Sequence, residues 1–284
     1  MTMAASFMPS LDERIAVLRR AGRSFAIATV VRTVDATSAK PGAKALILAD
    51  GTIEAGWIGG GCARGAVIKA AIEALGDGRP RFVSLRPEEL LEAEGATHGT
   101  ERAGVRYARS RCPSKGSMDV FVEPVTPPPD LVICGESPVA LALCELSACL
   151  GFSRTLCAPG LTAERTPLVE RLVDGFDLHG ARSSGEAGAE CYVVVATQGK
   201  GDEAALRAAI SAGAAHVAFV GSRRKFAALR ERLTAAGVPE SGLATVKAPA
   251  GLDIAAITPH EIALSILADI VALRRGRQRQ PGRA

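Results

Sequence analysis

Aromatic side chains are scarce in this chain, whose 284 residues include one tryptophan, two tyrosines and eight phenylalanines. Proteins that bind single-stranded nucleic acid stack bases on aromatic side chains in a basic groove, so this scarcity argues against a nucleic-acid partner. No apolar run reaches the roughly 18 residues of a membrane-spanning helix. The N-terminal sequence MTMAASFMPS has neither the basic start nor the apolar centre of a secretory signal. We therefore expect a cytoplasmic protein without a membrane span.

Cysteine pairs and the commonest catalytic motifs are also missing. The seven cysteines are odd in number and form no C-x-x-C motif, which argues against a disulfide framework or a structural zinc site. The absence of G-x-S-x-G and G-x-x-x-x-G-K-[ST] argues against α/β-hydrolases and P-loop proteins. The formal net charge is +4, but residues 274–284 hold five arginines, which leaves 4 − 5 = −1 for the rest. We expect a near-neutral body and a disordered basic tail over 274–284.

The proline-rich segment 125–130 predicts a linker between two domains, because consecutive prolines fit neither a helix nor a central strand. Residues 1–124 show a capping box at Ser10 and a hairpin signal at Asp50-Gly51, which indicates an α+β domain. The expected elements there are helices over residues 11–21 and 63–75, the second ending at Gly76, and strands over 25–34, 45–49, 52–58 and 118–123. The polar stretch before residue 118 shows little periodicity.

Residues 131–273 alternate short apolar strands with helical patterns, which is typical of a Rossmann-like, doubly wound parallel sheet. The expected strands cover residues 131–134, 155–157, 191–196 and 216–220, and the expected helices cover 138–150, 203–212, 224–236 and 259–274. The predicted fold class is therefore α/β, with an N-terminal α+β domain followed by a Rossmann-like domain.

Three glycines, Gly59, Gly60 and Gly61, connect an apolar strand to a helix that carries Cys62 in its first turn. Glycine lets a ligand approach the backbone closely, and the N–H groups of a helix N-terminus attract anions and lower the pKa of a thiol. Cys62 is therefore a candidate catalytic thiolate beside an anionic ligand. The alternative interpretation is a tight turn in which Cys62 is a small buried side chain.

Cys112 is the second cysteine of interest because cations and small residues flank it: Arg109, Arg111, Lys115 and Gly116. Lys40 and Lys44 add positive charge to the same domain. If the fold brings Cys62 and Cys112 together, the two thiolates suit a thiophilic metal or a persulfide. Their spacing alone does not show that they meet.

The segment from Gly135 to Ala140 occupies the place of a dinucleotide fingerprint, but Ser137 replaces the middle glycine. The acidic ribose ligand expected after the second strand is also replaced, by residues 157–159 (Cys-Ala-Pro). Gly135, Ser137 and Ala140 are thus candidates for binding NAD(P), FAD or another ADP-like group. The alternative is a Rossmann-like domain without a dinucleotide.

A further candidate anion site follows the strand at 216–220. Gly221 and the predicted N-cap Ser222 precede three cations in the first helical turn: Arg223, Arg224 and Lys225. Cations there oppose the helix dipole by about 0.3–1 kcal/mol each, and a bound anion would offset this. Lys200, in another loop after a strand, could join them. Alternatively, these side chains simply extend into water.

Four separated segments carry a recognisable pattern: residues 38–44 (SAKPGAK), 56–67 (GWIGGGCARGAV), 221–225 (GSRRK) and 251–269 (GLDIAAITPHEIALSILAD). Together they resemble the XdhC/CoxI-type accessory proteins, which help to mature molybdenum hydroxylases such as xanthine dehydrogenase and carbon monoxide dehydrogenase. The resemblance implies a cofactor-handling domain, a Rossmann-like domain, and a role in binding molybdenum cofactor and passing it to the apoenzyme. The family's glycine-cysteine motif maps onto Gly60, Gly61 and Cys62.

This chain departs from the usual family pattern at three places. Ala63-Arg64 replaces Val-Glu, residues 112–116 replace a Cys-Gly-Gly element, and Thr197-Gln198 replaces a threonine-histidine pair. These changes are most similar to the CoxF-type branch of carbon monoxide dehydrogenase maturation.

The leading hypothesis is a maturation factor, more a cofactor-binding chaperone than a turnover enzyme, with Cys62 and Cys112 as metal or sulfur ligands. Lys115 and the cations at 223–225 would neutralise phosphate. Expected partners are an apo molybdenum hydroxylase, a sulfur donor protein and a second copy of the chain. The alternatives are an NAD(P)- or FAD-dependent oxidoreductase and a copper or sulfur delivery protein for a bimetallic site.

Overall fold

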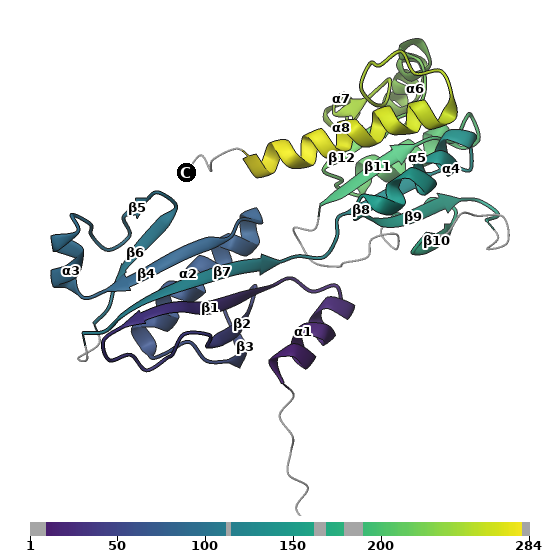
Figure 1. The fold of residues 1–284 in the computed structure, drawn as a ribbon. Coiled ribbons are helices and arrows are strands. Elements are labelled where there is room, and N and C mark those ends of the chain that lie inside the picture. Colours follow the sequence, from purple (N-terminus) through teal and green to yellow (C-terminus); the bar gives the residue numbers. More distant parts are fainter. Residues whose placement is uncertain (1–9, 112–114, 162–168, 179–189, 280–284) are drawn as a thin grey trace, which may run out of the picture. The chain divides into compact units, whose positions relative to one another are not determined.

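The computed structural model describes residues 10–111, 115–161, 169–178 and 190–279, and for Cys62 and residues 277–279 only the backbone (Figure 1). The chain divides into two compact units, Met1–Pro127 and Pro128–Ala284. No helix among the described residues is both long and apolar enough to cross a membrane.

The first unit is built on a mostly antiparallel sheet with the strand order β3-β2-β1-β7-β4-β6-β5. Of the strands that the structure describes in this sheet, only β4 and β6 pair in parallel. Its strands are β1 (Phe25–Val34), β2 (Lys44–Leu48), β3 (Ile53–Gly56), β4 (Arg81–Arg86), β5 (Glu101–Arg102), β6 (Val105–Arg109) and β7 (Ser117–Val125). The long central pair, β1 and β7, runs in register from Phe25 opposite Val125 to Val34 opposite Ser117, with a bulge after Val30.

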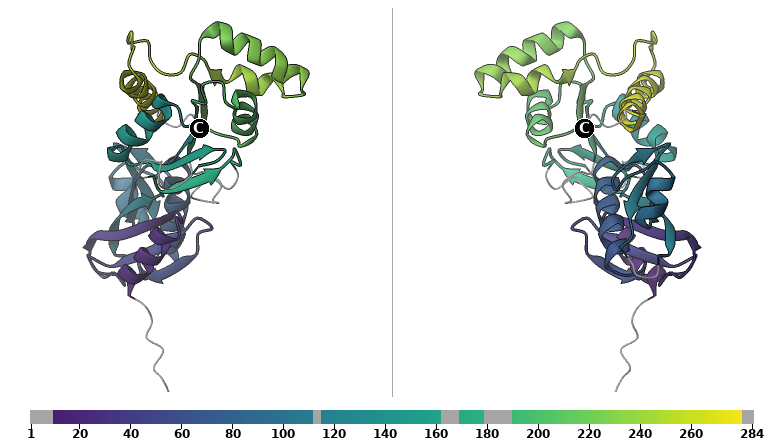
Figure 2. Two further views of the ribbon diagram at one scale, coloured as in Figure 1. Left: turned by 90° about the vertical axis from the view of Figure 1, so that its right-hand side faces the viewer. Right: turned by 90° about the vertical axis from the view of Figure 1, so that its left-hand side faces the viewer.

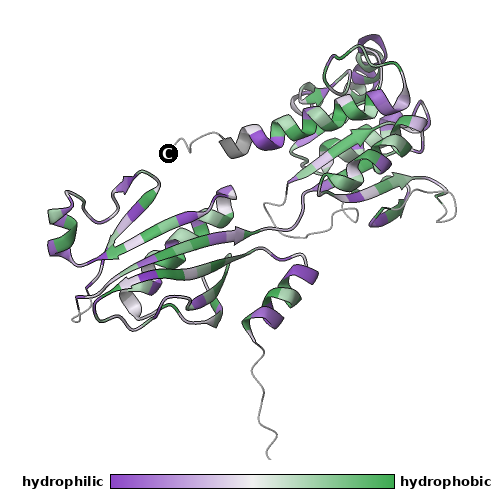
Figure 3. Cartoon of the chain, viewed as in Figure 1, coloured by the Kyte–Doolittle hydropathy of each residue, from purple (hydrophilic) through white to green (hydrophobic). Residues whose placement is uncertain are grey.

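In the part of the unit that the structure describes, three helices accompany this sheet: α1 (Leu11–Arg20), α2 (Gly61–Asp77) and α3 (Glu88–Ala93). Residues of β1 alternate between two cores, because successive side chains of a strand point to opposite faces. Ala26, Ala28 and Val30 pack with α2, whereas Phe25 packs with Leu18 of α1. The face of α2 in the core is rich in alanine, which lets the helix lie close to the sheet. Figure 3 shows the hydrophobic strands of this sheet in green.

Among its described residues, the second unit contains six parallel strands in the order β10-β9-β8-β11-β12-β13. Numbered from the first strand of the unit, this is the order 3-2-1-4-5-6 of dinucleotide-binding folds. The strands are β8 (Asp130–Cys134), β9 (Ser153–Ala158), β10 (Arg171–Asp174), β11 (Cys191–Val195), β12 (His216–Phe219) and β13 (Val246–Lys247). The strand order reverses between β8 and β11, where open α/β sheets bind their ligands.

Helices cover both faces of this second sheet (Figure 2). One apolar core joins α4 and α8 to residues such as Ile133 and Val194, and another joins α5, α6 and α7 to residues such as Val132 and Val193. The elements are α4 (Pro138–Leu146), the 3-10 turn η1 (Ser147–Cys149), α5 (Asp202–Ser211), α6 (Arg223–Ala235), α7 (Glu240–Ala244) and α8 (Pro259–Arg279).

The fold class predicted from the sequence is confirmed, and most of the expected elements are present. The capping box forms as expected, since Glu13 N donates to Ser10 Oγ and Ser10 N donates to the Glu13 carboxylate. The hairpin at Asp50-Gly51 also forms, between β2 and β3. The sequence missed the strand β4, which lies between β7 and β6, and six elements of two to six residues: α3, β5, β6, β10, α7 and β13.

Several predicted boundaries were wrong. Helix α2 passes through Gly76 and ends at Asp77, because Gly78 takes the left-handed conformation that terminates it (φ 70°). Strands include Val125 and Asp130, so only residues 126–129 of the expected linker lack regular structure.

The predicted start of the disordered tail, residue 274, was too early, because α8 continues to residue 279. Arg274 explains part of this order: its guanidinium carbon lies 4.8 Å from the ring centre of Phe152, and Nη1 donates to Leu150 O at 3.5 Å. Residues 280–284 of that tail lie outside the described residues.

Candidate functional site

One end of the first unit's sheet gathers the segments that the sequence indicated. An isolated parallel bridge joins Ala36 to Lys115. A Cβ on Gly116 would lie 2.3 Å from Ala36 O, and a Cβ on Gly59 would lie 3.3 Å from Ser38 Oγ. The loop after β1, the start of β7 and the glycine turn before α2 are therefore neighbours. We call this end of the unit the glycine edge.

Only one of the three consecutive glycines at this edge is required by the fold. Gly59 is buried and has φ of +113°, a conformation that other residues rarely adopt. Gly60 has φ of −75°, and a Cβ on Gly60 or on Gly61 would meet no atom within 4 Å. Gly60 and Gly61 are both exposed. Glycine at these two positions therefore exposes the backbone, although no contact with a described residue requires glycine there.

The start of α2 also lacks the usual compensation for its free N–H groups. Gly60 is the N-cap and makes no side-chain cap, and the first turn contains no acidic residue. The first N–H groups of a helix have no partner within the helix and favour a negative charge. Lys40 and Lys44 are exposed, and neither side chain bonds to a described residue. The glycine edge is thus suited to an anion.

The two candidate thiols are only partly covered by the structure. Cys62 is the second residue of α2, in the first turn as predicted. Its side chain lies outside what the structure describes. Cys112 lies outside the described residues altogether. Whether the thiols meet therefore stays a prediction. Among the described residues no group of His, Cys, Asp and Glu is arranged to hold a metal ion.

Lys115 is not a free cation. Its Nζ lies 2.7 Å from Glu89 Oε1, and this hydrogen bond raises the pKa of Lys115 and lowers the pKa of Glu89. Arg109 is similarly paired with Glu88 at 2.7 Å. These residues line a surface pocket of about 340 Å³ together with Pro87, Ser110 and Arg111. Exposed pairs of this kind contribute little free energy, so a stronger anion could displace Glu89 from Lys115.

Asp119 is an important residue of this unit that the sequence analysis missed. It is 4% exposed and accepts hydrogen bonds from Arg32 Nε at 2.7 Å and Ser84 Oγ at 2.8 Å, while Arg86 Nη1 lies 2.9 Å away. Burial opposes its ionisation, but the hydrogen bonds from Arg86 and Ser84 prevail and hold the pKa of Asp119 below its usual value. This carboxylate ties β7 to β1 and β4, two residues beyond Ser117, and so helps to position the glycine edge. A carboxylate among the apolar residues Met118 and Val120 was the available signal.

The predicted fingerprint of the second unit is a strand, a turn and a capped helix. Ser137 Oγ caps α4 by accepting from Ala140 N at 3.2 Å. Gly135 has φ of +114°, and a Cβ there would lie 2.5 Å from Ala196 O. The fold alone therefore requires Gly135, through its contact with the segment after β11. No ligand is needed to explain it.

The cations after β12 divide into one that is paired and two that are free. Lys225 Nζ lies 2.6 Å from Asp202 Oδ2 and 5.4 Å from the ring centre of Phe219. Arg223 and Arg224 are exposed and bond to no described residue. Ser222 caps α6 as predicted. Lys225 is therefore committed to an internal ion pair.

Asp202, which sequence reasoning overlooked, closes the segment that follows β11. It accepts hydrogen bonds from Thr197 Oγ1 and from Gly199 N, and it pairs with Lys225. Burial opposes its ionisation, yet the bonds from Lys225 and Thr197 lower the pKa of Asp202. Lys200 is exposed in the same loop. Gly221 is packed against Phe219, because a Cβ would lie 2.4 Å from the ring.

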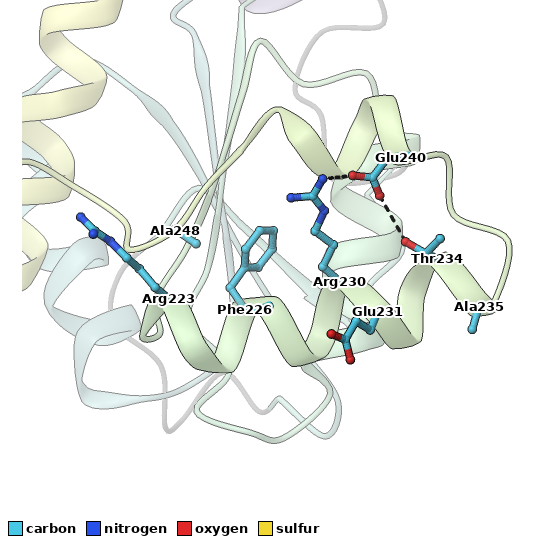
Figure 4. A pocket seen from close by; sticks show the side chains of 9 residues that line it. Arg223, Phe226, Arg230, Glu231, Thr234, Ala235, Glu240 and Ala248 are labelled. Carbon is cyan, nitrogen blue, oxygen red and sulfur yellow. Dashed lines mark hydrogen bonds and ion pairs between the residues drawn. The ribbon is translucent and has the colours of Figure 1, made fainter.

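A surface pocket of about 760 Å³ follows one side of α6 (Figure 4). Arg223 lies at one end, and Phe226 and Ala248 form part of its apolar lining. An ion pair between Arg230 and Glu240 bridges it. Of the residues predicted from the sequence, only Arg223 lines this pocket.

Comparison with known proteins matches both units. Residues 18–86 match the model of the XdhC and CoxI family, and residues 131–270 match the model of the XdhC Rossmann domain. The uncharacterized protein YqeB of Escherichia coli (strain K12) is 31% identical over 253 residues, which cover 88% of this chain and 43% of YqeB. The chain therefore spans less than half the length of that relative.

A solved structure described as a xanthine dehydrogenase from Bacillus halodurans is also similar. It is 17% identical, with a TM-score of 0.45, and the match covers 96% of this chain and 97% of that one.

Proposed function

Because this chain belongs to the XdhC and CoxI family, we propose that it is a maturation factor that binds the molybdenum cofactor and assists its sulfuration or its insertion into a molybdenum hydroxylase. The observation that carries the proposal is the bare start of α2. Gly60 and Gly61 expose backbone that has no steric need for glycine, at a helix end that favours an anion. The phosphate of a molybdopterin is an anion of this kind.

Different residues of the glycine edge would contact different parts of the cofactor. The first N–H groups of α2 would hold the phosphate, and Lys40 and Lys44 would add positive charge. Cys62, in the same turn, would present a thiolate to the metal or its sulfur, since a helix N-terminus lowers the pKa of a thiol. Cys112 remains the proposed second thiol. The cofactor, when bound, would supply a molybdenum centre and its sulfur ligands.

The pairing of two lysines narrows the set of residues proposed to bind phosphate. Lys115 must leave Glu89 to do so, and Lys225 must leave the buried carboxylate of Asp202. Lys115 can exchange partners readily because its pair is exposed, whereas Lys225 helps to hold its own unit together. Arg223 and Arg224 remain available for a partner or ligand of the second unit. The client would be an apo molybdenum hydroxylase, with carbon monoxide dehydrogenase or xanthine dehydrogenase as examples, and a sulfur donor protein would act on the bound cofactor.

The test is to purify the protein anaerobically from cells that make molybdenum cofactor and to identify the bound pterin by mass spectrometry. Wild type should carry molybdopterin, and Cys62→Ser should carry much less. Cys149→Ser is the matched control, because Cys149 is an exposed thiol in the second unit. Wild-type protein free of pterin, or Cys62→Ser that retains all of it, would contradict the proposal.

A dinucleotide in the second unit is a second candidate, favoured by its 3-2-1-4-5-6 strand order. Ser137 in place of the middle glycine and the missing acidic residue after β9 weaken it. Equilibrium dialysis against NADPH and FAD tests this candidate, and no retention of either would end it.

A further inference from the structure

Trp57 stands between β3 and the glycine turn on a backbone that is held from both sides. Gly56 before it has φ of +82°, and a Cβ at Gly56 would lie 2.1 Å from Lys44 O. Trp57 N donates to that same carbonyl oxygen at 2.8 Å. Ile58, which follows, is fully buried in the core beneath α2. The position of Trp57 is therefore set by the sheet and not by its own side chain.

The side chain of Trp57 belongs to neither core of the first unit. Ala55 packs against the core beside α1 and Ile58 lies in the core beside α2, but Trp57 between them is 51% exposed. Phe25, an aromatic residue of the same unit, is fully buried. A large apolar side chain that a fixed backbone leaves half exposed is suited to contact a ligand, and the planar indole is suited to stacking.

The surroundings of Trp57 indicate what this ligand carries. The exposed backbone of Gly60 and Gly61 follows three residues later, with open space where side chains would be. Lys44, whose carbonyl holds Trp57, has an exposed ammonium group without a described partner. A flat apolar surface thus lies close in sequence to groups that favour an anion. A ligand that satisfies both has a planar heteroaromatic ring joined to a phosphate.

We propose that Trp57 stacks on the pterin ring of the ligand whose phosphate is held at the start of α2. This rests on the proposed function and adds to it a residue that distinguishes a pterin phosphate from other anions. The glycine edge would then bind both ends of the molecule: Trp57 would contact the ring, and the backbone of Gly60 and Gly61 would bind the phosphate. Inorganic phosphate would engage only the second part.

The experiment uses Trp57 as its own reporter, because it is the only tryptophan of the chain. The full-length protein is titrated with a pterin monophosphate, and separately with inorganic phosphate, while tryptophan fluorescence is recorded. Calorimetry gives the dissociation constants of wild type and the variants Trp57→Ala, Trp57→Phe and Phe121→Ala. Phe121 is the matched control, because it is an aromatic residue of the same unit, in β7, that is 37% exposed.

We expect the pterin monophosphate to quench the fluorescence and inorganic phosphate to leave it nearly unchanged. Loss of one aromatic stacking surface should weaken pterin binding about fivefold or more in Trp57→Ala. Trp57→Phe should keep most of the affinity, and Phe121→Ala should bind as wild type does. Because the side chain of Trp57 is half exposed, Trp57→Ala should remain folded, and circular dichroism checks this.

The outcomes separate this inference from the function on which it rests. If wild type carries molybdopterin and Trp57→Ala carries and binds as much, the stacking contact is wrong and the maturation role stands. If fluorescence is quenched but Trp57→Ala keeps its affinity, the ring passes near Trp57 without stabilising contact, and the inference is again wrong. If wild type neither carries molybdopterin nor binds the pterin monophosphate, the inference and the proposed function both fail.

Discussion

Replacing Gly61 by alanine should stabilise the protein and weaken its binding of cofactor at the same time. Gly61 is the first residue of α2, and a Cβ there would meet no atom within 4 Å. Glycine in a helix is less favourable than alanine by about 1 kcal/mol in helix interiors, and less near the end. A glycine that the fold does not need therefore lowers the stability of the protein, and we attribute its presence to ligand binding.

The expected gain in stability is about 0.4–1 kcal/mol, the range for Gly→Ala changes at compatible backbone positions. For units of this size that raises the melting temperature by about 1–4 °C. The added methyl group would occupy space that we assign to the ligand. If the clash between this methyl group and the ligand costs as much as overpacking a core, the binding free energy weakens by about 1–3 kcal/mol, which is roughly 5- to 150-fold in affinity.

Gly76→Ala is the control, because Gly76 lies in the same helix with open space around its Cα but 15 residues further along. It should raise the melting temperature without changing the molybdopterin content. Differential scanning calorimetry and mass spectrometry of the bound pterin measure the two effects. The reasoning is refuted if Gly61→Ala carries as much cofactor as Gly76→Ala, or if it melts at a lower temperature than wild type.

Two further predictions concern the scaffold. Asp119→Asn should lower the free energy of unfolding by about 2–3 kcal/mol at pH 7, because it breaks a largely buried ion pair. The pKa of Asp119 is lowered in the folded protein, so its contribution is complete above the unfolded pKa of about 3.9 and is lost as the pH falls through the lower folded value. Urea unfolding between pH 3 and 7 should show the two proteins converging in acid, and a constant difference would contradict this assignment. Gly135→Ala should lose about 2 kcal/mol or more, because alanine at φ of +114° is strained and its Cβ would meet Ala196 O at 2.5 Å. Unchanged urea midpoints for this variant would show that the turn can move away from β11.

Local signals predicted much of the architecture, because they act within a few residues. The capping box at Ser10, the turn at Asp50-Gly51 and the many β-branched residues of β1 are each local features of the sequence. The elements between residues 81 and 109 were missed for the opposite reason. Strand β4 is flanked by β7 and β6, and its polar side chains Ser84 and Arg86 are stabilised by Asp119, more than thirty residues away. No pattern within β4 itself reveals that partner.

The sequence by itself determined the two-part α/β organisation, the family and the glycine turn that precedes Cys62, since these depend on residue type and order. Only the tertiary structure decided which residues of the candidate site are available for a ligand. Glycine identity does not distinguish Gly59, which its backbone conformation requires, from Gly61, which nothing nearby requires. Charge does not distinguish Lys225, neutralised by Asp202, from Arg223, which is exposed. The first distinction lies in the backbone conformation and the second in a contact between segments distant in sequence, and both exist only once the chain is folded.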